Sequence, residues 1–227
     1  MRKILLSLAA CLLLFALFPR GTSVSATAEL PQERLVALTF DDGPYAPVTE
    51  RILDVLEQNG ARATFFVVGE RVDFSWRELA RADALGCEIG NHTFTHADLT
   101  ALSPAERREE ITLTNTAIRS CIGRLPTLVR PPYGFSNAQV LAEFSLRSVG
   151  WTVDTEDWKT RDAAKTFDCV RRETHAGSVI LMHDLYPATA DAVEKIVPWL
   201  IGEGYRLVTV SELIASGASV PTFVDLI

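Results

Sequence analysis

The chain has 227 residues, of which 48% are hydrophobic and 22% charged. This composition fits one folded domain with a buried core and excludes a disordered, collagen-like or coiled-coil chain. The formal net charge of −7, without a Lys/Arg-rich stripe, excludes a function that begins with binding nucleic acid phosphates. We therefore expect a neutral or polar substrate.

The first residues have the form of an export signal. Two basic residues precede an apolar run from Ile4 to Phe18. A bilayer span needs about 20 apolar residues, and this run is shorter. We expect a signal peptide over residues 1–28, cleaved after Ala28 or, alternatively, after Ala26. After cleavage, we expect a protein without a membrane span that is secreted or held in the cell wall. The alternative is that the segment stays uncleaved as a membrane anchor.

The remaining cysteines do not suggest a disulfide framework. Cys87, Cys121 and Cys169 are odd in number and lack CxxC spacing. We expect ordinary buried thiols with at most one disulfide.

From Arg34 onward, short apolar runs alternate with segments of 3.6-residue apolar spacing, which is typical of a parallel sheet wrapped by helices. Seven strands are predicted: Leu35 to Phe40, Ala63 to Val68, Cys87 to Gly90, Thr127 to Arg130, Ser148 to Val153, Val179 to Met182 and Arg206 to Val210. The sequence therefore predicts one α/β domain over residues 34–215, followed by a peripheral tail over 216–227.

Two predicted helices have well-marked ends. The helix after the first strand carries an apolar face and ends at Asn59-Gly60. The longest helix begins with a capping box at Ser103 and Glu106 and runs to Gly123.

Polar clusters follow five of the predicted strands, where the chemistry of parallel β/α folds is found. The clusters are Thr39 to Pro44 (TFDDGP), His92 to His96 (HTFTH), Arg130 to Gly134 (RPPYG), Asp154 to Trp158 (DTEDW) and Leu181 to Asp184 (LMHD).

The histidine pair and the aspartate pair together predict a metal site. His92 and His96 have i, i+4 spacing, which places both imidazoles on one side of a helical turn. One carboxylate of Asp41-Asp42 would complete a two-His, one-carboxylate set, and the other would remain free as a base. Each feature also has a structural interpretation: a satisfied histidine pair, and turn residues that end a strand.

The other polar residues are ambiguous when each is taken alone. Arg130 suits a structural ion pair, and His183 a core histidine. Asp154 and Asp157 suit loop caps.

The five clusters, in this order and spacing, resemble the motifs of the polysaccharide deacetylase family, the carbohydrate esterase family 4 enzymes with a NodB-type domain. The similarity covers residues 35 to about 214. It implies a distorted (β/α) barrel of about seven parallel strands. The one departure noted is Tyr45, where His is common, and it concerns the rim of the groove.

The resemblance also implies a role for each site residue. The metal ligands are Asp42, His92 and His96. The general base is Asp41, held by Arg130, and the general acid is His183, tuned by Asp154. The backbone N–H of Tyr133 would help bind the oxyanion, and Trp158 and Leu181 would line the pocket for the acetyl methyl group.

The implied activity is metal-dependent hydrolysis of N-acetyl groups on a polysaccharide, with peptidoglycan N-acetylglucosamine as the expected substrate. Zinc is the expected ion, with Co²⁺ or another divalent ion as alternatives. Chitooligosaccharide deacetylation and acetylxylan esterase activity are alternatives within the family. A catalytically silent carbohydrate-binding domain is the alternative outside enzymes, and a monomer is expected.

Overall fold

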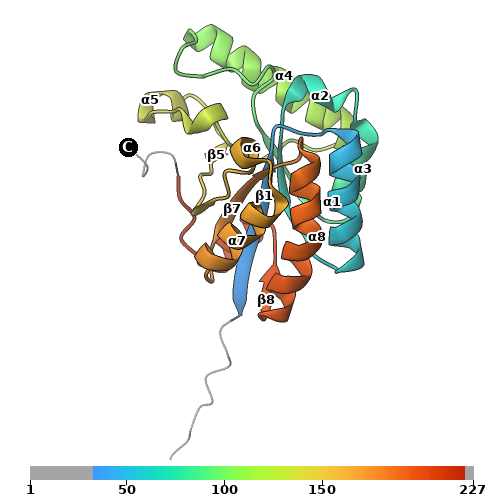
Figure 1. The fold of residues 1–227 in the computed structure, drawn as a ribbon. Coiled ribbons are helices and arrows are strands. Elements are labelled where there is room, and N and C mark those ends of the chain that lie inside the picture. The colour runs from blue at the N-terminus through green and yellow to red at the C-terminus, as the bar shows by residue number, and fades with distance from the viewer. Residues whose placement is uncertain (1–32, 223–227) are drawn as a thin grey trace, which may run out of the picture. The chain divides into compact units, whose positions relative to one another are not determined.

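The computed structural model describes residues 33–222 (Figure 1). The predicted signal peptide over residues 1–28 lies outside the described residues, as do residues 223–227. Within 33–222, no helix has both the length and the apolar character needed to cross a bilayer.

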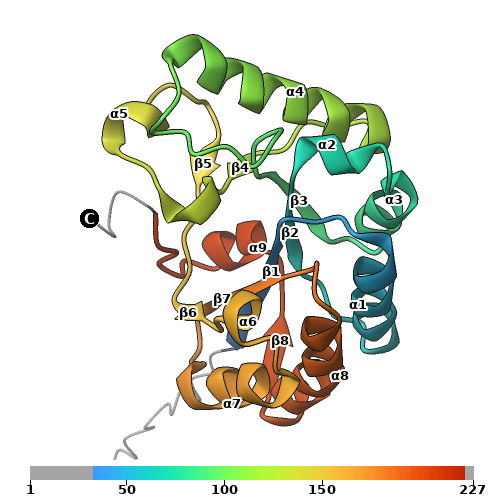
Figure 2. The same ribbon diagram turned by 45° about the horizontal axis from the view of Figure 1, so that its top comes forward.

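A sheet of eight strands, all paired in parallel, forms the centre of this unit (Figures 1 and 2). The strand order is β5-β4-β3-β2-β1-β7-β6, and β8 also pairs with β1. The strands are β1 (Arg34–Asp41), β2 (Thr64–Val67), β3 (Glu88–Asn91), β4 (Leu128–Val129), β5 (Arg147–Ser148), β6 (Val153–Asp154), β7 (Val179–His183) and β8 (Tyr205–Leu207). The prediction of an α/β fold built on parallel strands is confirmed.

The segment Ser148 to Val153 was predicted as one strand, and this is wrong. It contains parts of β5 and β6, which lie at opposite ends of the strand order. Val149 N–H still donates to Val129 O beside β4, whereas Thr152 N–H donates to Val179 O beside β7. The chain thus crosses from one end of the sheet to the other within a few residues, and this crossing curls the sheet into a distorted, incomplete barrel.

Helices and short helical turns connect the strands. They are α1 (Ala46–Gln58), α2 (Gly69–Val72), α3 (Trp76–Ala84), α4 (Pro104–Ile122), η1 (Pro132–Gly134), α5 (Ala138–Leu141), α6 (Asp157–Thr160), α7 (Ala163–Glu173), α8 (Pro187–Gly202) and α9 (Val210–Ala215). Helix α8 packs against both α1 and α7, and the three lie side by side along the sheet in Figure 2.

The predicted ends of the two marked helices are confirmed. Ser103 and Glu106 form the capping box of α4, and Gly123 ends this helix in the left-handed conformation. Asn59 caps α1, and Gly60 follows with a φ of 59°.

The alternation of side chains along β1 separates two apolar clusters. Val36, Leu38 and Phe40 lie in the larger cluster with buried residues of α1, α3, α7 and α8. Leu35 and Ala37 lie in the smaller cluster with residues of α9. Because side chains alternate with a period of two, Asp41 continues the second row, which is apolar at its start and polar at its end.

The end of the described chain differs from the peripheral tail that we expected. Val220 is buried in the smaller apolar cluster. Pro221 O accepts a hydrogen bond from Gly150 N–H at 2.8 Å. The end of the described chain therefore contacts the segment between β5 and β6, where the chain crosses the sheet.

Candidate active site

Asp41 lies at the carboxyl end of β1 and is almost fully buried against Arg130. Arg130 Nη1 donates to Asp41 Oδ1 at 2.7 Å and to Thr39 Oγ1 at 2.8 Å. The other N–H groups of this guanidinium donate to Val149 O and Gly150 O in the crossing segment. Burial lowers the pKa of Arg130, and the neighbouring Asp41 carboxylate opposes this shift. The guanidinium therefore fixes the orientation of Asp41 and balances its charge.

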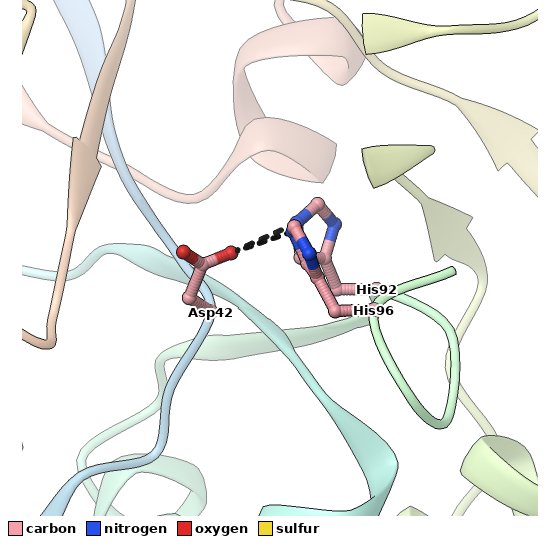
Figure 3. A group of neighbouring side chains, drawn as sticks. All are labelled: Asp42, His92 and His96. Carbon is pink, nitrogen blue, oxygen red and sulfur yellow. Dashed lines mark ion pairs between the residues drawn. The ribbon is translucent and has the colours of Figure 1, made fainter. Parts of the chain in front are cut away.

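Asp42, His92 and His96 come together from two loops at the same edge of the sheet (Figure 3). Asp42 Oδ1 lies 3.2 Å from His92 Nε2 and 3.1 Å from His96 Nε2. Burial disfavours the charged form of Asp42, but the hydrogen bonds with both imidazoles outweigh it and hold the pKa of Asp42 well below its usual range. Two imidazole nitrogens and one carboxylate oxygen form a donor set suited to Zn²⁺ or a similar divalent ion.

A second contact orients His92. Its Nδ1 lies 2.6 Å from the carbonyl oxygen of Arg130. A carbonyl oxygen can only accept, so Nδ1–H is the donor and Nε2 keeps its lone pair for a ligand bond. The same arginine thus orients Asp41 through its side chain and His92 through its backbone.

The i, i+4 spacing of the two histidines predicted a helical turn, and this prediction is wrong. Residues 92–96 form a loop after β3, and Thr93 and His96 have φ angles of 64° and 61°. The left-handed backbone at these positions, rather than helical periodicity, brings the imidazoles to one side, with ring centroids 5.0 Å apart.

His183 ends β7, directly beside Asp41 in the parallel register. Its Nδ1 lies 2.8 Å from Asp157 Oδ1, and its backbone N–H donates to Asp157 Oδ2 at 2.8 Å. Thr189 Oγ1 also donates to Asp157 Oδ2. Burial favours the neutral form of His183, but the hydrogen bond with Asp157 and the charges of Asp157, Asp41 and Asp42 outweigh it and raise the pKa of His183 to about 9.

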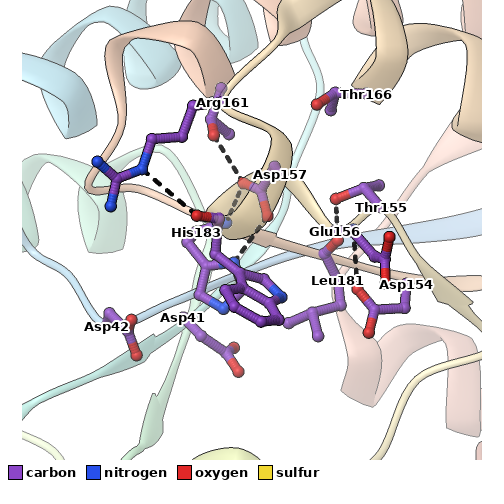
Figure 4. A network of polar contacts seen from close by, with 12 residues as sticks. Asp41, Asp42, Asp154, Thr155, Glu156, Asp157, Arg161, Thr166, Leu181 and His183 are labelled. Atoms are coloured by element: carbon purple, nitrogen blue, oxygen red, sulfur yellow. Dashed lines mark hydrogen bonds and ion pairs between the residues drawn. The ribbon is translucent and has the colours of Figure 1, made fainter.

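The expectation that Asp154 is the carboxylate bonded to His183 is wrong. Asp154 accepts a hydrogen bond from Glu156 N–H at 2.9 Å within its own loop, while Asp157 points at His183 (Figure 4). Asp154 ends the short strand β6, whereas Asp157 lies three residues later at the start of α6. Burial raises the pKa of Asp154, and this residue lines the pocket described below.

Strained backbone is concentrated in the loops of this site. Six non-glycine residues in the described part of the chain have positive φ: Asp42, Thr93, His96, Tyr133, Glu156 and Arg161. Five of them belong to the polar clusters at the strand ends, and Arg161 lies three residues after the Asp154 to Trp158 cluster. Such conformations cost about 1–3 kcal/mol each and persist where the surroundings enforce them, which is typical of functional sites.

One pocket of about 450 Å³ brings these groups together. It is lined by every predicted site residue except Arg130, which lies buried behind Asp41: Asp41, Asp42, His92, His96, Tyr133, Asp154, Trp158, Leu181 and His183. Tyr133 and Trp158 are about half exposed, so they offer aromatic surface at the mouth of the pocket.

Comparisons with known proteins agree with this arrangement. Residues 29–152 match the sequence profile described as polysaccharide deacetylase. The chain is 43% identical over 183 residues to the peptidoglycan-N-acetylmuramic acid deacetylase PdaC of Bacillus subtilis, covering 81% of this chain and 39% of PdaC. It is 37% identical over 195 residues to the peptidoglycan-N-acetylglucosamine deacetylase PgdA of Listeria monocytogenes, covering 86% and 42%. The chain thus spans about two fifths of the length of these curated relatives.

Solved structures agree as well. The structure of PdaC superposes with a TM-score of 0.81 at 42% identity, covering 82% of this chain and 93% of that one. A family 4 acetyl xylan esterase from Clostridium thermocellum, solved with a cobalt ion, gives 0.76 at 36% identity, covering 80% and 90%.

The chain belongs to the polysaccharide deacetylase family. Tyr45, the residue at which it departs from the family pattern, is about half exposed and precedes α1. It does not line the described pocket, whereas the aromatic residues Trp151 and Tyr186 do. Sequence reasoning did not assign these two residues to the site, because nothing in the local sequence distinguishes them from other aromatics.

Asp184, the last residue of the Leu181 to Asp184 cluster, was also given no role from the sequence. Its carboxylate is fully buried and accepts from Thr49 Oγ1 at 2.5 Å. Burial raises the pKa of Asp184 to about 7, and the Thr49 hydrogen bond opposes this shift. A Cβ at Gly43 would lie 2.1 Å from the carboxylate oxygens of Asp184, so only glycine fits in the turn after Asp42.

Proposed function

We propose that this protein hydrolyses N-acetyl groups on a cell-wall polysaccharide and releases acetate, acting at N-acetylglucosamine residues of peptidoglycan. One observation carries the proposal: a base held by Arg130, an acid held by Asp157 and a two-His, one-carboxylate donor set line one pocket. Metal-dependent amide hydrolysis uses a base to activate water, an acid to protonate the leaving amine and an ion to polarise the carbonyl, all at one carbon atom.

The donor set fits a divalent ion. Asp42, His92 and His96 would hold it, since their ligand atoms lie within 4.8 Å of one another and His92 is oriented by the Arg130 carbonyl. When bound, such an ion polarises the amide carbonyl and lowers the pKa of a water molecule toward neutrality. We expect Zn²⁺, with Co²⁺ or another divalent ion as alternatives.

The side chains divide the proton transfers between them. Asp41 accepts the proton of the attacking water, because Arg130 holds its carboxylate in a fixed orientation at the edge of the pocket. The backbone N–H of Tyr133, which has a left-handed backbone within the short turn η1, helps stabilise the oxyanion. His183, with its raised pKa, donates a proton to the leaving amine, which is too basic to depart unprotonated.

The pocket also suits a sugar ring with an acetyl group. Leu181 and Trp158 would contact the acetyl methyl, and the exposed ring of Tyr133 would stack on a sugar face. The relatives named as peptidoglycan deacetylases support a wall glycan as the substrate. The acetyl xylan esterase relative makes ester hydrolysis on xylan the second candidate, and chitooligosaccharides are a third.

A binding domain without catalysis is the remaining alternative. Loss of the base, the acid or a ligand would favour it, and this chain keeps Asp41, His183 and all three proposed ligands in one pocket. We further propose that residues 1–28 direct export, that residues 34–215 form the catalytic domain, and that the mature protein acts as a monomer.

Acetate release tests the proposal. The metal-loaded full chain is incubated with peptidoglycan, chitooligosaccharides or acetylated xylan, beside an Asp41→Asn control. We expect acetate from peptidoglycan and at least a hundredfold less from the control, the usual scale for a general base. Acetate from xylan but not from peptidoglycan would overturn the substrate assignment, and no acetate from any substrate would favour the binding domain.

A further inference from the structure

Glu110 lies on α4, outside the pocket lining, yet all three of its side-chain contacts recorded in the structure reach the loop that carries His92 and His96. Glu110 Oε2 accepts from Phe94 N–H at 2.7 Å and from Thr95 N–H at 2.8 Å. Its Oε1 accepts from Thr95 Oγ1 at 2.9 Å. One carboxylate thus binds two of the three residues between the two histidines, Phe94 and Thr95.

The opposite side of this loop is also fixed. The backbone N–H groups of Gly69 and Glu70, at the start of α2, donate to Thr93 O and Phe94 O. The buried side chain of Asn91 accepts from Thr93 N–H at 2.8 Å. Within residues 33–222, Glu110 is the acceptor for the next two backbone N–H groups, so removing its carboxylate would leave both without this acceptor.

The two histidines depend on this loop to different degrees. His92 is 3% exposed and has its own contact with the Arg130 carbonyl. His96 is 27% exposed, and its ring contacts Asp42 and the edge of the Tyr133 ring. Its φ of 61° is one that a β-carbon disfavours. The position of His96 therefore depends on the loop conformation that Glu110 stabilises.

We propose that Glu110 is a positioning residue that fixes His96 for metal binding. This inference rests on the proposed metal site at Asp42, His92 and His96. A ligand held by a rigid loop loses less conformational freedom when the ion binds, and loss of such outer-shell partners typically weakens metal binding by about 10–100-fold.

Glu109 provides a matched control, because it is the adjacent glutamate on the same helix and its side chain is exposed. Apo-protein of the wild type, Glu110→Ala, Glu110→Gln and Glu109→Ala is titrated with Co²⁺, whose visible absorption reports the number and geometry of its ligands. Each variant is first tested for cooperative thermal unfolding of the apo form.

We expect the Kd for Co²⁺ to rise by about 10–100-fold in Glu110→Ala, with an altered Co²⁺ spectrum. Glu110→Gln, which keeps one accepting oxygen, should weaken binding less, and Glu109→Ala should stay within twofold of the wild type. Because Glu110 does not touch the substrate pocket, kcat of Glu110→Ala should recover at saturating metal. That recovery would not follow from general loss of structure.

Wild-type Kd and spectrum in folded Glu110→Ala would overturn the inference while leaving the metal site intact. If Glu110→Ala does not fold, Glu110→Gln decides: a Kd within twofold of the wild type refutes the role, and a clear rise supports it. If the wild type itself binds no Co²⁺, the proposed metal site fails and this inference fails with it.

Discussion

Replacing Asp157 by Asn should lower the alkaline limit of activity, because Asp157 is the carboxylate that keeps His183 protonated. Asp157 Oδ1 lies 2.8 Å from His183 Nδ1 and is nearly inaccessible to water. An asparagine at this position keeps the shape but removes the charge that stabilises the imidazolium. Asp154→Asn is the matched control, since Asp154 lies in the same loop and lines the same pocket without bonding to His183.

The expected size of the shift follows from the charges around His183. Burial favours the neutral form of His183, but neighbouring carboxylates raise its pKa from 6.5 to about 9, and Asp157 contributes more to this increase than Asp41 or Asp42. Without the Asp157 charge, less attraction remains to offset the effect of burial, which favours the neutral imidazole. The pKa of His183 should therefore fall by about one to two, which corresponds to a loss on the order of 1.4–2.7 kcal/mol in the stabilisation of the imidazolium. With a pKa near 7, only about 10% of the molecules carry the proton at pH 8, against about 90% with a pKa near 9.

The assay is the pH dependence of kcat/KM for deacetylation, with metal saturated at each pH. A bound cation lowers the pKa of His183 in every variant, so the comparison is made against the wild type with the same metal. The alkaline limb of Asp157→Asn should lie at least one pH unit below that of the wild type, and Asp154→Asn should keep the wild-type limb. The opposite result, in which only Asp154→Asn moves the limb, would refute our assignment.

Unfolding of the apo-protein gives a second test of the same contact. The folded-state pKa of His183 lies above its unfolded value of 6.5, so its stabilising contribution is complete below that pH and is lost as the pH rises through about 9. Urea unfolding should therefore show a larger stability difference between wild type and Asp157→Asn at pH 6 than at pH 10. An equal difference at both pH values would mean that Asp157 stabilises the protein only by accepting hydrogen bonds from the His183 backbone N–H and the Thr189 hydroxyl.

Three further predictions concern single residues. Asp42→Ala should abolish tight binding of a divalent ion, because two imidazoles alone form a loose site, and elemental analysis of the purified variant checks this. His183→Ala should keep the metal and the fold but lose turnover, most strongly on amides, whose leaving group needs protonation, and less on an activated acetyl ester. Arg130→Met should destabilise the protein by about 3–5 kcal/mol in urea unfolding, because Asp41 is left buried without its partner, and adding Asp41→Asn should recover part of the loss.

Local sequence signals were sufficient for most of the fold. The alternation of apolar runs and amphipathic segments predicted the parallel sheet, and the capping box at Ser103 marked the start of α4 correctly. The split of residues 148–153 into β5 and β6 could not be predicted, because Val149, Trp151 and Val153 alternate as they would in one continuous strand. Their separation arises from pairing with β4 on one side and β7 on the other, which is a property of the curled sheet.

The site was predictable in composition but not in its detailed contacts. The five clusters correctly indicated which loops meet, since parallel strands end at one edge. Whether Asp154 or Asp157 reaches His183 depends on the left-handed turn at Glu156. Glutamate is not a residue type that predicts a left-handed backbone. The contact by which Glu110 stabilises the histidine loop also could not be predicted. It joins residues 15 positions apart, and the sequence of this polar helix does not distinguish Glu110 from its other glutamates.

The adjacent aspartates of β1 serve different purposes because their backbones differ. Asp41 is still in the extended strand, so the period of two directs its side chain inward, along the row of Thr39, to the buried Arg130. Asp42 has a φ of 74°, which breaks that alternation and turns its carboxylate to His92 and His96 instead of to the opposite face of the sheet. Two like charges on neighbouring residues are tolerated because each has its own compensating partners. The proposed base and the proposed metal ligand can therefore face one pocket from consecutive positions, and the left-handed backbone of Asp42, between the strand and Gly43, makes this division possible.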